Sequence, residues 1–216
     1  QYSRRGTAFH LWVERQFTEA ATLFGDEYLD YLDPLDDDSK LEDLMAAWLK
    51  SSFANRTRLL LEVLDEVIQV WGSDRVGVRL SPYGTFNDMS DKDPVGLFTH
   101  VIEQLNPLNL AYLHLIEPRS TGAGGSDQVV KDVPSTSELF KKVFKGKVIM
   151  AGGYDRASAE AAVASGQADA VAFGRLYISN PDLVERFTQN AALTPYDRST
   201  FYGGTEKGYT DYPSLT

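Results

Sequence analysis

The sequence predicts an α/β protein in which about four parallel βα units follow a helical amino-terminal segment. Two observations lead to this fold class. From residue 75 onward, short apolar runs rich in β-branched and aromatic residues alternate with stretches of helical periodicity, which is typical of βα units and a parallel sheet. Each run is nearly all apolar, as expected of parallel strands that are covered on both faces.

The amino-terminal segment, residues 1–54, is expected to be helical. Apolar residues recur at helical spacing from Phe9 to Ala20, and Gly25 is a plausible end of this first helix. An acidic stretch follows, which we interpret as a solvated loop because its aspartates lack the spacing and the glycine of a calcium loop. A second helix is predicted at KLEDLMAAWLKSSF.

A third helix is predicted at ANRTRLLLEVLDEVIQVW, and Gly72 is expected to end it. Its apolar stripe consists of Leu59, Val63, Val67 and Val70, and it is widened by Leu60, Leu64 and Ile68.

The four strands are predicted at RVGVRLSP (75–82), LAYLHLIEP (110–118), KVIMAGG (147–153) and AVAFGR (170–175). Helices are predicted near residues 94–105, 136–144, 156–165 and 181–191. Strand and helix therefore alternate through the rest of the chain.

Composition limits the functional classes. The 216 residues are 43% hydrophobic and 24% charged, so a folded core is expected. The net charge of −10 argues against binding nucleic acid through phosphate contacts. The absence of cysteine excludes disulfides and thiolate catalysis. No apolar run is long enough for a transmembrane segment, so a soluble protein is expected. Its compartment stays open, because Arg4 and Arg5 are only weak evidence for the remnant of an organellar targeting segment.

The ends of the predicted strands are where a ligand would bind, because parallel βα folds place their sites at the carboxyl ends of the strands. The third strand ends at Gly152-Gly153 and the fourth at Gly174-Arg175. Two glycine turns on neighbouring strands, with an arginine beside one of them, predict a phosphate cradle. The alternative is that the glycines only permit tight turns and that the arginine pairs with an acid.

The predicted second strand contains two polar residues that could have a function. Glu117 lies at the strand's end and is a candidate for a substrate contact. His114 lies inside the strand, where a histidine is more often a satisfied core residue than a ligand.

The segments RVGVRLSP, AYLHLIEP, IMAGGYD, DAVAFGRLYISNPDLVERF and FYGGTEKGYTDYP resemble the carboxyl-terminal half of the old yellow enzyme family. These are FMN-dependent NAD(P)H ene-reductases built on a TIM barrel. The resemblance runs from about Asn55 to Leu215 and implies two parts: residues 1–54, which are not family-like, and residues 55–216, a half-barrel with a carboxyl-terminal tail. The fold that it implies is a partial TIM barrel.

The resemblance also implies an FMN site made by Arg79, Gly152, Gly153, Gly174, Arg175 and Tyr202. Arg79 is similar to the arginine that contacts the flavin ring near its anionic edge. The glycine turns and Arg175 resemble the phosphate-binding turns after the family's seventh and eighth strands. Tyr202, with Phe201 before it, resembles the aromatic residues that flank the flavin and substrate pocket.

The family's first four strands, its carbonyl-binding donors and its tyrosine proton donor find no match before Asn55. The resemblance therefore implies no catalytic residue in this chain. Four parallel strands leave two open edges and one exposed face, so we expect another protein chain or a second copy to cover them.

Two functions stay open. One is a degenerate, structural or accessory subunit of a larger assembly that retains a residual FMN phosphate site. The other is an FMN-dependent NAD(P)H oxidoreductase that is completed by another chain, or an engineered half-barrel. Whether the chain is an enzyme is therefore uncertain from the sequence.

Overall fold

The computed structural model describes residues 52–85, 90–118, 132–202 and 205–215. The chain divides into two compact units, residues 1–51 and residues 52–216, and every described residue belongs to the second. The first two predicted helices and the acidic stretch lie outside the described residues. The family-like boundary at residue 55 stays a prediction.

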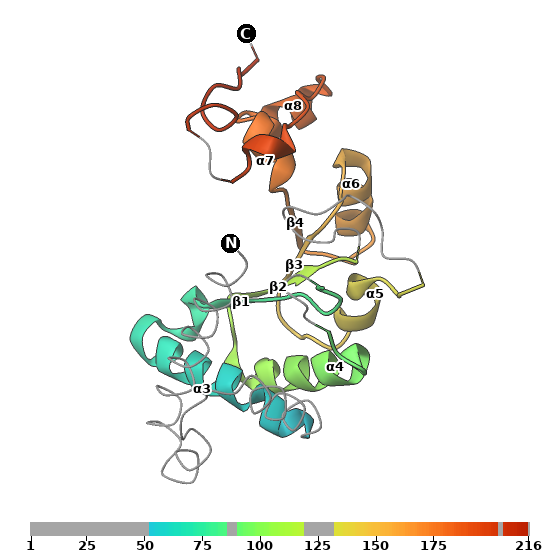
Figure 1. The fold of residues 1–216 in the computed structure, drawn as a ribbon. Helices are drawn as coiled ribbons and strands as arrows, with labels where there is room; N and C mark the ends of the chain where they lie inside the picture. The colour runs from blue at the N-terminus through green and yellow to red at the C-terminus, as the bar shows by residue number, and fades with distance from the viewer. Residues whose placement is uncertain (1–51, 86–89, 119–131, 203–204, 216) are drawn as a thin grey trace, which may run out of the picture. The chain divides into compact units, whose positions relative to one another are not determined.

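The described residues form one parallel sheet of four strands, in the order β1-β2-β3-β4 (Figure 1). The strands are β1 (Gly77–Leu80), β2 (Tyr112–Ile116), β3 (Val148–Ala151) and β4 (Ala170–Ala172). All four predicted strands are confirmed. Each is shorter than predicted because its terminal residues form the turns that lead into and out of the sheet.

The α-helices are α3 (Phe53–Trp71), α4 (Pro94–Leu105), α5 (Thr136–Phe140), α6 (Arg156–Ala164), α7 (Arg175–Ser179) and α8 (Leu183–Gln189). The 3₁₀ turns are η2 (Ser73–Arg75), η4 (Asn106–Leu108) and η5 (Arg198–Thr200). The sequence did not predict α7, which begins where the fourth strand was expected to continue. In the part of the chain that the structure describes, no helix is both long and apolar enough to cross a bilayer.

Local sequence signals set the helix ends. The side chain of Ser52 accepts a hydrogen bond from the backbone N–H of Asn55 and so caps α3. Gly72 ends α3 at a φ of 82°, a left-handed conformation that favours glycine. At α6, Asp155 and Ser158 form a reciprocal capping box.

The core lies on one face of the sheet. Alternate strand residues point to this face, and Leu113, Leu115, Val148 and Met150 are fully shielded from solvent. Helices α3, α4, α5 and α6 all contribute to the cluster around them (Figure 1). The main contributions are Leu64, Ile102, Leu105, Phe140 and Ala162.

The opposite face of the sheet is open within the described residues. Register places Gly77 and Arg79 of β1 beside Tyr112 and His114 of β2 on this face. Gly77, Arg79 and Tyr112 are exposed. The expectation that both faces are covered is therefore not met by the described part of the chain, whereas the expected exposed face is present.

Helix α3 packs by a narrower face than the sequence suggested. Leu60, Leu64 and Ile68 contact the core. The residues that we expected to form its main stripe are exposed: Leu59 51%, Val63 51%, Val67 37% and Val70 75%. We call these four residues the outer stripe of α3. A helix with apolar residues on two faces gives one broad periodic signal, which does not tell which face is buried.

The carboxyl-terminal tail is held by a buried arginine. Arg186 of α8 is 6% exposed and forms an ion pair with Asp182, with 2.7 Å between Nε and Oδ1. Its other guanidinium nitrogens donate to the carbonyl oxygens of Ala192 and Pro213. Asp182 also accepts a hydrogen bond from the backbone N–H of Leu215. This network lowers the pKa of Asp182, with Arg186 as the largest cause. The pair therefore ties α8 to both ends of the segment that follows it.

Replacing Arg186 by methionine should release the tail, because three hydrogen bonds are lost and a carboxylate is left without its partner. We expect cleavage by trypsin after Lys207 to become at least about tenfold faster, as for a segment that opens more often. Arg156→Met is the matched control, because Arg156 also forms an ion pair with an acid four residues away, Glu160, but on an exposed surface. Equal cleavage of the Arg186 variant and the wild type would show that the tail is held by other contacts.

Candidate functional site

Two glycine turns leave the sheet at adjacent positions. Ala151, the last residue of β3, pairs with Ala172, the last residue of β4. Gly152 and Gly153 follow Ala151 directly, and Phe173 and Gly174 follow Ala172. The structure thus brings the two predicted turns together at the carboxyl edge of the sheet, where βα folds bind ligands.

The fold itself requires the first turn to contain glycine. Gly152 and Gly153 adopt φ values of 103° and 72°, which side chains other than glycine's rarely tolerate. A Cβ atom added to Gly152 would lie 3.0 Å from the carbonyl oxygen of Glu117. Gly152 is therefore explained by the close approach of β2 and β3, whatever else the turn binds.

The second turn differs. Gly174 has a φ of −95°, which any residue adopts, and an added Cβ would meet no atom within 4 Å. Neither backbone conformation nor packing demands glycine at this position. The open space in front of Gly174 is what a turn that receives a ligand would show.

Two arginines lie close to the second turn. The guanidinium carbon of Arg175, the first residue of α7, lies 5.9 Å from the centroid of the Tyr196 ring. The guanidinium carbon of Arg198 lies 5.5 Å from the same centroid. The pKa of Arg175 is lowered, mainly by burial and further by the charge of Arg198. Two guanidinium groups therefore lie beside the same ring, and guanidinium N–H groups are donors that suit an anion.

The structure places Arg79 apart from these turns, on β1 at the other edge of the sheet. Its side chain lies on the open face beside His114. Among the described residues, Arg79 forms no hydrogen bond or ion pair. The pKa of His114 is lowered by burial and, to a smaller extent, by the charge of Arg79.

Tyr202 follows η5 and is 69% exposed, whereas Phe201 before it is 4% exposed and packs on Tyr196 with ring centroids 5.5 Å apart. The neighbouring predicted aromatics thus differ in role: Phe201 anchors the segment, and only Tyr202 is presented to solvent.

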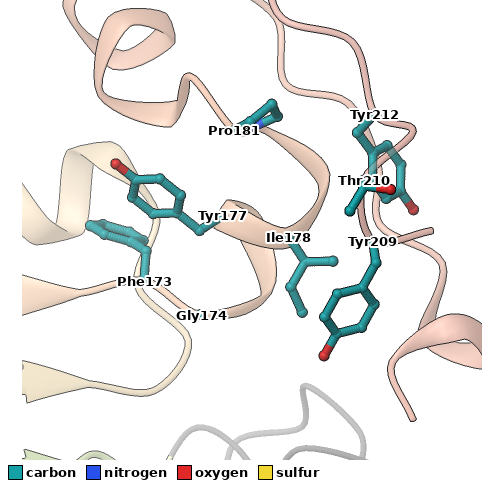
Figure 2. A pocket seen from close by; sticks show the side chains of 8 residues that line it. All are labelled: Phe173, Gly174, Tyr177, Ile178, Pro181, Tyr209, Thr210 and Tyr212. Carbon is teal, nitrogen blue, oxygen red and sulfur yellow. The ribbon is translucent and has the colours of Figure 1, made fainter. Parts of the chain in front are cut away.

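A pocket of about 390 Å³ lies beside Gly174, and it was not predicted from the sequence (Figure 2). Its lining residues are Phe173, Gly174, Tyr177, Ile178, Pro181, Tyr209, Thr210 and Tyr212. Figure 2 shows the side chains of α7 on one side and those of the tail on the other. The sequence signal that could reveal this pocket is the repeated tyrosine of GYTDYP, because Tyr209 and Tyr212 both line it.

Glu117 does not have the role that we expected from its position after β2. It is 1% exposed and accepts hydrogen bonds from the backbone N–H groups of Thr136 and Ser137. The hydroxyls of Ser135 and Tyr154 donate to it as well. All these donors occupy the carboxylate, which fixes the start of α5, so Glu117 is a structural residue rather than a substrate contact.

Comparison with known proteins agrees with this architecture. The sequence model of one protein family, the NADH:flavin oxidoreductase / NADH oxidase family, matches residues 47–194. A putative 12-oxophytodienoate reductase 10 from Oryza sativa is 47% identical over 164 residues, which cover 74% of this chain and 51% of that protein. The 12-oxophytodienoate reductase 2 from Arabidopsis thaliana is 42% identical, and 43% of its length is covered.

Solved structures give the same result. Morphinone reductase in complex with tetrahydroNAD is 42% identical with a TM-score of 0.68, and the match covers 78% of this chain and 44% of that one. The old yellow enzyme from Trypanosoma cruzi is 34% identical with a TM-score of 0.70, and the match covers 77% and 42%. The chain spans about half the length of the relatives that it matches.

These matches confirm the resemblance seen in the sequence and the partial TIM barrel. They also indicate FMN, the cofactor of the matching family. With its four parallel βα units and its glycine turns at the carboxyl edge, the chain belongs to the NADH:flavin oxidoreductase / NADH oxidase family, which includes the old yellow enzymes.

Proposed function

We propose that this chain supplies the FMN phosphate-binding half of an oxidoreductase barrel. The observation that carries the proposal is the second glycine turn, where Gly174 faces open space and Arg175, the next residue, lies with Arg198 beside the ring of Tyr196. Backbone N–H groups and a guanidinium are the donors that bind phosphate best. The residues present therefore fit the phosphate end of FMN.

The other predicted residues receive roles consistent with this proposal. When bound, FMN supplies hydride transfer between a nicotinamide and a substrate. Arg79, an exposed cation on the open face, would balance the negative charge of a reduced flavin ring. Gly152 and Gly153 would present backbone N–H groups to the phosphate, and exposed Tyr202 would border the substrate pocket.

The relatives suggest the class of substrate. They are named as reductases of 12-oxophytodienoate, whose name contains an oxo group, and of morphinone, whose name has the ending of a ketone. We infer that the complete barrel to which this chain belongs reduces an alkene that is activated by a neighbouring carbonyl group.

The uncovered surfaces of the described residues support a partner that completes the barrel. Within the described residues, β1 and β4 each pair on one side only, one face of the sheet is open, and the outer stripe of α3 is exposed. Open strand edges and apolar stripes are normally covered by another element. Another protein chain or a second copy of this one is the proposed occupant. A purely structural or accessory role is the alternative if no flavin is bound.

Flavin content tests the proposed function directly. The chain, purified with whatever accompanies it and then denatured, should release one FMN per copy. Arg175→Ala should lose FMN while riboflavin, which lacks the phosphate, binds as before, because only the phosphate contact is removed. Arg58→Ala, which removes an exposed charge on α3, is the control. The absence of FMN after incubation with excess would favour the accessory role.

The two glycine turns should respond differently to alanine. Gly152→Ala should lower the free energy of unfolding by about 1–3 kcal/mol, because a positive φ strains any residue with a side chain and the added Cβ would crowd the Glu117 carbonyl. Gly174→Ala should change stability by less than about 0.5 kcal/mol and yet weaken FMN binding. Urea denaturation and flavin-fluorescence titration measure the two effects. A Gly174 variant that binds FMN normally would remove this turn from the site.

The outer stripe of α3 should mediate association. Val63→Glu with Val67→Glu should leave the fold intact, because both side chains are exposed. Sedimentation velocity should then show the variant at the mass of the single chain, 24.0 kDa, and the wild type in a larger assembly. Glu66→Gln, at an exposed position between the two valines, is the control. A wild-type chain that sediments alone would contradict the proposed covering of this surface.

A further inference from the structure

Arg79 and His114 are neighbours on the open face of the sheet. The parallel register of β1 and β2 pairs them directly, one residue further along than the pair formed by Val78 and Leu113. Val78 and Leu113 point into the helix-covered core, so Arg79 and His114 point away from it. Neighbouring strands lie about 4.8 Å apart, so side chains paired in this way on one face are close enough to interact, and the charge of Arg79 does act on His114.

Neither of these two side chains has a hydrogen-bond partner among the described residues, and one can donate where the other can accept. The Nε2 atom of His114 is shielded from solvent and has no hydrogen-bond partner among the described residues. Arg79 has no hydrogen-bond or ion-pair partner among those residues and is exposed. A shielded polar atom without a partner is costly, whereas a guanidinium has five N–H donors and no acceptor. The two groups are therefore complementary if the imidazole is neutral.

The surroundings of His114 keep it neutral. Its pKa is lowered, first by burial and then by the charge of Arg79. On β3 the residue paired with His114 is the uncharged Ile149. On β2, the strand of His114 itself, the neighbour on the same face is Tyr112. The hydroxyl of Tyr83, which follows β1, has a pKa raised by burial and by Glu117, so it is also uncharged near neutral pH. A neutral imidazole has one nitrogen that accepts a hydrogen bond.

We propose that His114 is the positioning residue for Arg79: when the open face is occupied, the neutral imidazole accepts a hydrogen bond from the guanidinium, a bond that is not formed in this structure, and the remaining N–H groups are directed to the occupant. That the occupant is the flavin ring rests on the proposed function. The pairing itself rests only on the register, the exposure and the hydrogen-bonding capacity of the two side chains. It gives His114 a role that the sequence alone did not suggest.

The pairing can be tested without any cofactor. Nuclear magnetic resonance of the imidazole rings should give the pKa of His114 readily, because the chain has three histidines and His114→Gln identifies the signal. In Arg79→Met this pKa should rise toward the ordinary value of about 6.5, since a neighbouring positive charge is removed. Arg75→Met, which removes an exposed charge near the amino end of β1, should leave it unchanged. An unchanged pKa in Arg79→Met, or an equal rise in Arg75→Met, would overturn the pairing.

The positioning role is tested with FMN as the probe, by quenching of its fluorescence on the chain purified with whatever accompanies it. His114→Gln, which keeps an acceptor, should bind FMN within about threefold of wild type, whereas His114→Leu should bind about tenfold more weakly. In the Arg79→Met background, His114→Leu should have no further effect. Affinity should also fall as the pH is lowered through the pKa of His114, in wild type but not in His114→Gln.

The outcomes separate the two proposals. Circular dichroism of each variant shows whether it is folded. If His114→Leu is folded and binds FMN as wild type does, or if its effect adds in full to that of Arg79→Met, the positioning role is wrong. If the wild type binds no FMN at all, the proposed function fails, and the imidazole titration still decides whether His114 and Arg79 are paired.

Discussion

The burial of one face of the sheet is the constraint on which the rest of this structure depends. Leu113, Leu115, Val148 and Met150 are fully buried beneath the helices, and parallel pairing locks their strands in register. Because side chains alternate along a strand, this burial fixes which residues face the other way. A shift of β2 by one residue would bury His114 in the apolar core and expose Leu113. Core packing thereby determines which polar groups are available for chemistry.

The sequence predicted the elements well because the signals for them are local. Gly72 ends α3 and Asp155 caps α6, and each acts within a few residues of its own position. The role of Glu117 could not be predicted in this way, since its donors lie 18 to 20 residues along the chain, and Tyr154 lies 37 along. Only the fold reveals that a carboxylate at the end of a strand is already occupied.

The candidate site shows the same division between local and tertiary information. The two glycine turns were both recognised from the sequence, but not the difference between them. Gly152 is required by the backbone of the neighbouring strand, whereas Gly174 borders open space. The sequence also suggested too broad a packed face for α3, because Leu59 and Leu60 contribute equally to a hydrophobic periodicity and differ only in what packs on them. The identity of packing partners is not encoded in the spacing of apolar residues.

The shortness of β4 has a consequence for the order of the site. It has three residues, and in the described part of the chain it pairs with β3 alone. A short strand at a sheet edge has few backbone hydrogen bonds to lose, so it opens at a lower free energy than the strands at the centre. The turn at Gly174 follows this least protected strand directly. A phosphate held there would select the closed form of the edge, and its binding energy would appear as slower amide exchange in β4.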